Sequence, residues 1–337
     1  MKKIVTLGEI LLRLSTVTGE RLSQSSELSL HYGGAEANVA VSLANFGYNV
    51  YFVSKIPENP LGLAAERHLR SFGVRTDYVQ KGGERIGTYY LESGVGERSA
   101  QVTYDRKHSS FSQIFIEDVA LSEILEGAGL FHVSGITPAL SENVRKLTLV
   151  ALQKAKELGV KTSFDFNYRA KLWSQQEAGA AFAELLPYVD ICSCGELDAI
   201  HFLNIDKVDH VLQKNEQLEY YYEKINEKYP NIKYLYSTFR NVISASHNRL
   251  QGNFYVNGQL YQSKEYDINP IVDRVGGGDA YSSGVLCGII DNMTPQETVS
   301  FATAASALKH TVHGDSNLFS KAEIKGFIEN DSGKIVR

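Results

Sequence analysis

The stretch Asp273-Arg-Val-Gly-Gly-Gly-Asp279 runs directly into Ala-Tyr-Ser-Ser-Gly-Val-Leu-Cys-Gly-Ile-Ile. Its three consecutive glycines, Gly276, Gly277 and Gly278, carry no Cβ, so a ligand can approach the bare backbone amides. Apolar residues recur at helical spacing after Asp279, which predicts that the turn opens onto a helix N-terminus. Unpaired N–H groups and the positive end of the helix dipole make such a turn a site for an anion, for example a phosphate.

Asp279 lies in the first turn of this predicted helix, where the dipole is expected to hold its carboxylate ionised. A carboxylate beside an anion site can accept the proton of a hydroxyl group as that hydroxyl attacks phosphorus. The simpler interpretation is a glycine-rich turn that only starts a helix, with Asp279 as a capping residue. A plain cap requires none of the three glycines, so the combination favours phosphoryl transfer with Asp279 as the base.

Two separated motifs resemble the signatures of a known family. D-R-V-G-G-G-D, at 273–279, resembles the D-T-x-G-A-G-D signature of the ribokinase-like (PfkB) carbohydrate kinases. G-G-A-E-A-N-V-A, at 33–40, resembles the sugar-side signature of the same family. The resemblance extends over essentially the whole chain. It implies an α/β, ribokinase-like three-layer sandwich with a mostly parallel central sheet and a small antiparallel β lid, and an enzyme that uses ATP and Mg²⁺.

The composition is that of a globular protein with a substantial core. The 337 residues suffice for one large α/β domain or two smaller ones, and 43% are apolar and 22% charged. The net charge of −5, with scattered basic residues, argues against nucleic acid or an anionic membrane as the main partner.

The N-terminal segment and the cysteines indicate the cytoplasm. Two lysines precede apolar residues in MKKIVTLGEILLRLS, but Gly8, Glu9 and Arg13 interrupt the run, so neither a signal peptide nor a membrane span is expected. An odd number of cysteines, three, indicates a reducing compartment rather than a disulfide framework. Cys192 and Cys194 are expected to be buried thiols on a strand.

Strand and helix patterns alternate along most of the chain, which predicts a mostly parallel sheet covered by helices on both sides. Asn59-Pro60 is typical of a helix start, with a capping side chain and proline at the first helical position. The expected parallel strands are residues 3–8, 51–55, 130–134, 160–165 and 189–193. The expected helices are residues 36–46, 141–158, 176–186, 207–229, 280–290, 295–309 and 321–329. An antiparallel edge is expected from residues 233–237, 242–246, 252–256 and 259–263.

The pattern changes where short alternating segments are separated by glycines. Residues 86–92 and 99–104 are expected to be antiparallel strands, and with 11–15 and 28–32 they would form a small separate sheet. The family resemblance implies a single ribokinase-like domain over residues 1–337, with this lid inserted from about 11–32 and 76–106. It also implies a homodimer or higher homo-oligomer through the lid. The alternative is an ordinary edge hairpin.

The sugar side of the expected site is drawn from three places in the sequence. Two arginines suit an acidic sugar better than a neutral one, because a guanidinium matches a carboxylate with two parallel hydrogen bonds. Within the family the pattern is most similar to kinases of 2-keto-3-deoxygluconate. By that resemblance the substrate-binding residues are Gly33, Gly34, Tyr90, Tyr104, Arg106 and Arg169. Two more are expected from their residue types: Asn38, a polar amide on the predicted helix, and Tyr89, a ring that would bracket the sugar with Tyr90 and Tyr104.

The nucleotide side departs from the family pattern in four places. Arg274 replaces the usual threonine and Gly277 the usual alanine, and the N-x-x-E motif appears as Ser193-Cys-Gly-Glu196. The nucleotide loop reads Ser237-Thr-Phe-Arg-Asn, without glycines, so Arg240 is a candidate phosphate contact. By the resemblance the ATP-binding residues are Asn167, Ser193, Glu196, Thr238, Arg240, Gly276, Gly278 and Asn317, and the metal ligands stay open.

The prediction is an ATP- and Mg²⁺-dependent kinase that phosphorylates the terminal hydroxyl of 2-keto-3-deoxygluconate, with Asp279 as base and Gly276, Gly277 and Gly278 around the transferring group. One alternative is a kinase of a neutral sugar such as fructose or ribose. Another is a non-catalytic sugar-acid sensor on the same scaffold. A dinucleotide-dependent oxidoreductase is disfavoured because no G-x-G-x-x-G follows the first strand.

Overall fold

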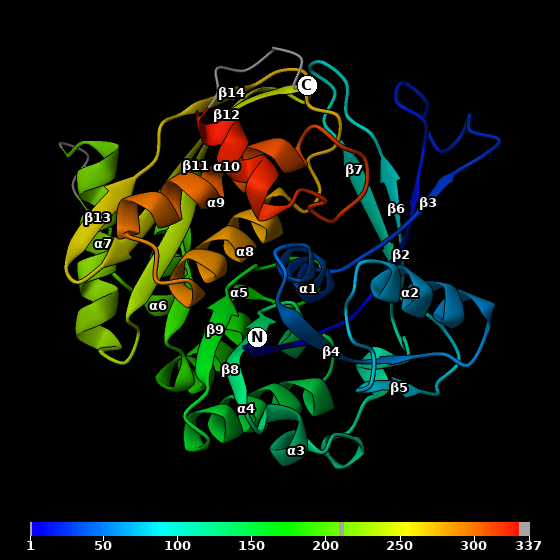
Figure 1. Ribbon diagram of the computed structural model, residues 1–337. Coiled ribbons are helices and arrows are strands. Elements are labelled where there is room, and N and C mark those ends of the chain that lie inside the picture. The colour runs from blue at the N-terminus through cyan, green and yellow to red at the C-terminus, as the bar shows by residue number, and fades with distance from the viewer. Residues whose placement is uncertain (1, 209–211, 330–337) are drawn as a thin grey trace.

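The computed structural model describes residues 2–208 and 212–329. Within these residues, ten strands form one central sheet, ordered β13-β12-β11-β10-β9-β8-β1-β4-β5, with β14 paired to β12 (Figure 1). Neighbours from β5 to β11 are parallel, and β11, β12 and β13 are antiparallel. The strands are β1 Lys3–Leu7, β4 Asn49–Ile56, β5 Val79–Lys81, β8 Ala128–Ser134, β9 Lys161–Asp165, β10 Ile191–Ser193, β11 Tyr234–Ser244, β12 His247–Val256, β13 Gln259–Gln262 and β14 Tyr266–Ile268.

Helices cover both faces of this sheet, which confirms the predicted α/β sandwich (Figure 1). Each face buries its own apolar cluster against the sheet, as expected for parallel strands that are apolar on both sides. One layer contains α1 Ala35–Asn45, α2 Pro60–Ser71, α8 Gly277–Ile290, α9 Pro295–Lys309 and α10 Lys321–Glu329. The other contains α3 Leu121–Leu125, α4 Glu142–Glu157, α5 Gln175–Leu185, α6 Glu196–Leu203 and α7 Lys214–Lys228.

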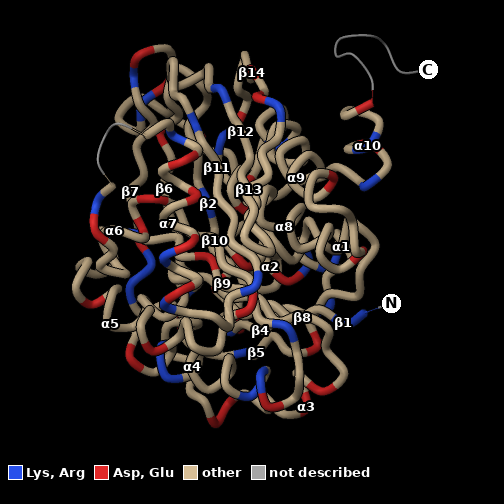
Figure 2. Tube along the Cα trace, turned by 90° about the vertical axis from the view of Figure 1, so that its left-hand side faces the viewer, with Lys and Arg blue, Asp and Glu red and all other residues tan. Residues whose placement is uncertain are grey.

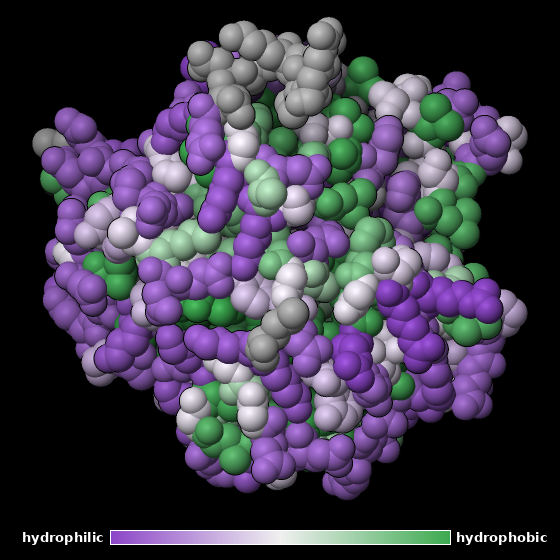
Figure 3. Space-filling model, viewed as in Figure 1, coloured by the Kyte–Doolittle hydropathy of each residue, from purple (hydrophilic) through white to green (hydrophobic). Residues whose placement is uncertain are grey.

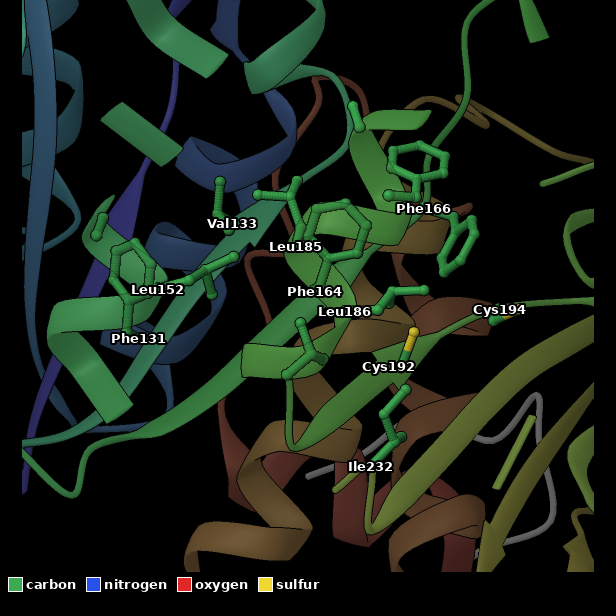
Figure 4. Close-up of a cluster of buried hydrophobic side chains, with 14 of the residues drawn as sticks. Phe131, Val133, Leu152, Phe164, Phe166, Leu185, Leu186, Cys192, Cys194 and Ile232 are labelled. Carbon is green, nitrogen blue, oxygen red and sulfur yellow. The ribbon is translucent and has the colours of Figure 1, made fainter. Parts of the chain in front are cut away.

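The cluster beneath α4 and α5 includes Phe131, Phe164 and Phe166 (Figure 4). Cys192 and Cys194 are free, buried thiols in the same cluster, as predicted. The start of α2 is also confirmed: the Asn59 side chain accepts hydrogen bonds from the amides of Leu61 and Gly62, at 3.0 and 3.1 Å.

The surface is polar and mixed in charge. Lys and Arg are interspersed with Asp and Glu along the trace in Figure 2. The face in Figure 3 is mainly hydrophilic, with apolar side chains in separate patches. Among the described residues, no helix is long and apolar enough to cross a membrane.

The predicted lid is a separate sheet, ordered β3-β2-β6-β7, beside the main sheet (Figure 1). Its two antiparallel hairpins are joined by one parallel pairing, between β2 and β6. The turn at its tip touches the body, because the amide of Ala245 donates to the carbonyl oxygen of Gly96 at 2.8 Å. The lid strands are β2 Leu11–Ser15, β3 Ser29–Gly33, β6 Thr88–Glu92 and β7 Gln101–Asp105.

Several expected boundaries differ from the structure. β11 is one strand rather than two, because the antiparallel ladder with β12 continues through Phe239, Arg240 and Asn241. α6 was not predicted, and α7 begins at Lys214 rather than at residue 207; residues 209–211 of that prediction lie outside the described part. β5 falls within the range expected for the lid but pairs with β4 in the main sheet.

Candidate active site

The glycine turn forms the N-terminus of α8, as predicted, and packs tightly against the segment that follows α9. Gly276 precedes the helix with φ of +78°, in the left-handed region. A Cβ on Gly276 would lie 1.7 Å from the backbone carbonyl oxygen of Asp315, and one on Gly277 would lie 2.5 Å from the ring of His310. A Cβ on Gly278 would meet nothing within 4 Å. Two of the glycines are therefore required by packing, and the third is open.

Asp279 lies in the first turn of α8 and is partly exposed, toward a cavity. The Nδ2 of Asn38, from α1, donates to its carboxylate at 2.7 Å. Burial raises the pKa of Asp279 to about 7, and the bond from Asn38 lowers it only in part. The pKa of Asp279 is therefore higher than expected for a carboxylate at a helix N-terminus, and the largest cause is the loss of solvation. A base that titrates near 7 suits proton transfer at neutral pH.

Asp279 faces a cavity of about 390 Å³ between the lid, α1, the carboxyl ends of the central strands and the glycine turn. Ligands in open α/β sheets bind at this edge. The structure brings most of the predicted site residues to its lining, namely Gly34, Asn38, Tyr89, Tyr104, Arg106, Asn167, Arg169, Arg240, Gly276, Gly277, Gly278 and Asp279.

Other predicted residues lie outside this lining. Tyr90 pairs across the lid with Leu14 and Thr103, on the face opposite to Tyr89, because successive residues of a strand point to opposite sides. Asn317 is 1% exposed and contacts Asn45 rather than open space. The predicted residues not found in the lining are Gly33, Tyr90, Ser193, Glu196, Thr238 and Asn317.

Four arginines line the cavity, and they differ in whether a carboxylate is ion-paired with them. Arg106 is buried and pairs with Glu9, with 2.9 Å from Nε to the carboxylate. Arg169 is exposed and donates only to backbone carbonyls, at 3.0 and 3.2 Å. Arg240 and Arg274 make no hydrogen bond or ion pair with the described residues, and burial together with Arg274 lowers the pKa of Arg240. Guanidinium groups gathered without carboxylate partners favour an anionic ligand.

Sequence reasoning missed several lining or supporting residues. Asp165 lines the cavity, and burial raises its pKa to about 6. Asp315 also lines it and accepts a hydrogen bond from the Tyr89 hydroxyl at 2.5 Å. Glu9 partners Arg106. Asp315 is 226 positions from its lid partner Tyr89, so no local pattern in the sequence places the two together.

The described residues contain no group of three or more His, Cys, Asp and Glu side chains that could hold a metal ion. Magnesium, however, usually keeps several waters and binds through one or two carboxylates together with substrate phosphates. Asp165 offers such a carboxylate beside Asp279. The site therefore fits a Mg²⁺ ion that arrives with a nucleotide, with Asp165 as the candidate protein ligand.

A second cavity, of about 580 Å³, lies beneath the outer part of the lid and meets the first at Arg274, Val275 and Val102. It is larger, but neither the three glycines nor Asp279 line it. The chemistry is therefore assigned to the smaller cavity.

The sequence profile of the pfkB family carbohydrate kinases matches residues 1–322. The chain belongs to this family. It is therefore a carbohydrate kinase, and the alternative of a non-catalytic sensor is set aside.

Individual relatives agree with the family. The solved structure of a PfkB family carbohydrate kinase from Listeria grayi is 47% identical, with a TM-score of 0.93 over 98% of this chain and 100% of that one. A 2-dehydro-3-deoxygluconokinase from Thermotoga maritima is 42% identical, with a TM-score of 0.94 and the same coverage. By sequence, a 2-dehydro-3-deoxygalactonokinase from Haloferax volcanii is 32% identical over 335 residues, 99% of each chain. These neighbours confirm the ribokinase-like fold.

Proposed function

We propose that this PfkB kinase transfers the γ-phosphoryl group of ATP, with Mg²⁺, to the terminal hydroxyl of 2-keto-3-deoxygluconate, also called 2-dehydro-3-deoxygluconate. The observation that carries the proposal is one cavity that holds both Asp279 at the glycine turn and an exposed arginine, Arg169, with no carboxylate partner among the described residues. The printed names of the Thermotoga and Haloferax relatives support a substrate of this class.

Asp279 accepts the proton of the attacking hydroxyl in this proposal. Asn38 holds the carboxylate from one side at 2.7 Å, which leaves the other oxygen free for the hydroxyl. The amides of Gly277 and Gly278 lie at the start of α8, where the helix dipole favours the negative charge of the transferring group. Arg240 and Arg274 add two positive charges on the same side. Mg²⁺, when bound, neutralises charge on the phosphates.

The sugar carboxylate is assigned to Arg169 rather than to Arg106. Arg106 already has a carboxylate partner in Glu9, so a second anion gains less there. Arg169 lines the same cavity without an ion-paired carboxylate among the described residues, and it attracts the carboxylates of Asp165 and Asp279 only at longer range. Arg106 is instead positioned to donate to a sugar hydroxyl or keto oxygen.

Arg169→Ala is expected to raise KM for the sugar acid about 10- to 100-fold, the equivalent of one charge-assisted hydrogen bond, while KM for ATP changes little. Steady-state kinetics with each substrate varied in turn measures both values. Arg75→Ala, which removes an exposed arginine paired with Asp77, is the control and should match the wild type. Equal losses for sugar acid and ATP would contradict the assignment.

The pH profile is expected to follow Asp279. The base must be deprotonated to act, so kcat/KM should rise about tenfold per pH unit below about 7 and level off above it. Initial rates at constant ionic strength, with saturating Mg²⁺, give the profile. A rate that is independent of pH between about 5.5 and 7.5 would count against Asp279 as the base.

A kinase of a neutral sugar is the second candidate, and the Arg106–Glu9 pair favours it, because this pair cancels one of the two charges expected at the sugar side. Competition between 2-keto-3-deoxygluconate and fructose or ribose for the same enzyme separates the two candidates.

We also propose that the lid and the main sheet belong to one domain and that copies of the chain associate through the outer face of the lid. Leu30 is 58% exposed there, in one cross-strand row with Leu14 and Tyr90. An exposed apolar row on a sheet favours burial against a partner. A cytoplasmic location agrees with the three reduced thiols.

A further inference from the structure

Three charged side chains from distant parts of the sequence meet beneath the two cavities. Arg13 lies on lid strand β2, Asp273 begins the glycine turn, and Asp315 follows α9. Arg13 pairs with both carboxylates, at 2.7 Å for Asp315, and all three side chains are at most 6% exposed. The Nε of Arg13 also donates to Ser15 at 2.6 Å. The guanidinium thus uses its planar fork to join three segments.

The cluster is neutral as a whole, which is what allows it to be buried. Lys309 is fully buried and donates to the backbone carbonyl oxygen of Asp273 at 3.1 Å. Two cations therefore face two carboxylates, because Lys309 also interacts electrostatically with Asp273 and Asp315. Removing Arg13 would leave Asp273 and Asp315 close together without the ion that separates them.

Each carboxylate makes contacts that position a different part of the active site. Asp273 accepts hydrogen bonds from the amides of Val275 and Gly314, at 3.0 and 3.1 Å, and so fixes the first residues of the glycine turn. Asp315 lines the substrate cavity, accepts from the Tyr89 hydroxyl, and places its backbone carbonyl against Gly276. Among the described residues, Arg13 is the side chain that ion-pairs with both.

We propose that Arg13 is a positioning residue that couples the lid over the sugar to the glycine turn that holds the phosphoryl group. Through Arg13, the lid and the turn move as one body, so a sugar seated against Tyr89 and Asp315 aligns Gly276, Gly277 and Gly278 for transfer. The inference rests on the proposed function, since it assigns the sugar and the phosphoryl group to these two parts of the cavity. Misplacement by about 1 Å at a reacting centre can cost about 100-fold in rate.

The test compares Arg13→Lys with Arg85→Lys. Both keep the charge, but a lysine ammonium cannot reproduce the fork that spans two carboxylates. Arg85 is on the same lid side, partly exposed, and pairs with Asp105 at the surface, so it is the matched control. We expect kcat of Arg13→Lys to fall at least about 30-fold, with sugar-independent ATP hydrolysis forming a larger share of turnover. Arg85→Lys should stay within about twofold of the wild type.

Amide hydrogen exchange gives a readout that does not depend on turnover. Adding Mg·ADP to the wild type should slow exchange in β6 and β7, because the turn and the lid are connected. Arg13→Lys should lose this response, although its exchange without nucleotide stays close to that of the wild type. Wild-type kcat together with a retained lid response would overturn the proposal. If the wild type phosphorylates no sugar acid, the proposed function fails, while the lid response still decides the role of Arg13.

Asp273→Asn and the double variant Arg13→Met/Asp273→Asn cover the case in which Arg13→Lys does not fold, because the double variant removes one of the two carboxylates together with the cation between them. If Arg13 acts by holding Asp273, the double variant loses no more kcat than Asp273→Asn alone. Losses that multiply in the double variant would mean that the two residues act independently, and would also overturn the proposal.

Discussion

Asp279→Asn is expected to lower kcat by about 10³-fold, within the range for loss of a general base, while the affinity for both substrates changes little. Asparagine has the same shape and can still accept the hydrogen bond from Asn38, but it cannot take the proton of the hydroxyl. The same variant should melt at a higher temperature than the wild type at pH 8. Folding raises the pKa of Asp279 to about 7, so above that pH the ionised carboxylate lowers the free energy of unfolding. The amide of asparagine is neutral at every pH and carries no such penalty.

Single-turnover kinetics and calorimetric titration separate the chemical step from binding for Asp279→Asn. Asp77→Asn, at an exposed surface pair, is the control for the loss of one carboxylate. A variant that keeps kcat within tenfold of the wild type would mean that another group takes the proton.

Gly276→Ala is expected to abolish most activity and to destabilise the fold. The added Cβ would lie 1.7 Å from the carbonyl oxygen of Asp315, and backbone atoms of a packed segment cannot move aside easily. The left-handed φ of +78° adds about 1–2 kcal/mol of strain for alanine. We expect the free energy of unfolding to fall by several kcal/mol and kcat/KM by at least about 100-fold, because the turn must shift.

Gly278→Ala is the matched variant for this prediction. Its Cβ would meet no protein atom within 4 Å, so stability should stay near that of the wild type. Because Gly278 lines the cavity, its Cβ would crowd the phosphoryl group, and KM for ATP should rise. Thermal unfolding and steady-state kinetics, each measured on both variants, give one melting temperature and one kcat/KM for each variant. Equal stability of the two variants would contradict the packing of the turn on Asp315.

The fold followed from patterns that depend on local sequence. The helix at 295–309 was predicted with its observed ends, and its start is a strong local signal in which the Thr294 side chain accepts from the Glu297 amide. The split of β11 was predicted wrongly because polar residues at 240–241 look like a turn, whereas pairing with β12 carries the strand through them. Pairing between distant strands is not indicated by the local sequence.

The site could be predicted only as far as its residues lie in motifs. Asp279 and its glycines were found because one contiguous stretch holds them. The Arg106–Glu9 pair could not be found, because its members are 97 positions apart and an arginine's partner is decided by the fold. The choice between Tyr89 and Tyr90 likewise depends on which face of the lid turns inward. The raised pKa of Asp279 could not be predicted from the motif, because burial is a property of the folded protein.

The proposed acceptor in this cavity is a six-carbon keto acid. The most direct measurement is sugar-dependent release of ADP with ATP and Mg²⁺, over 2-keto-3-deoxygluconate, its galactonate epimer, fructose and ribose, with the phosphorylated position read by phosphorus NMR. We expect a kcat/KM for one of the keto acids at least about 100-fold above that for either neutral sugar, with phosphate on the terminal carbon. Comparable turnover of fructose or ribose, or ADP release that no sugar acid stimulates, would contradict it.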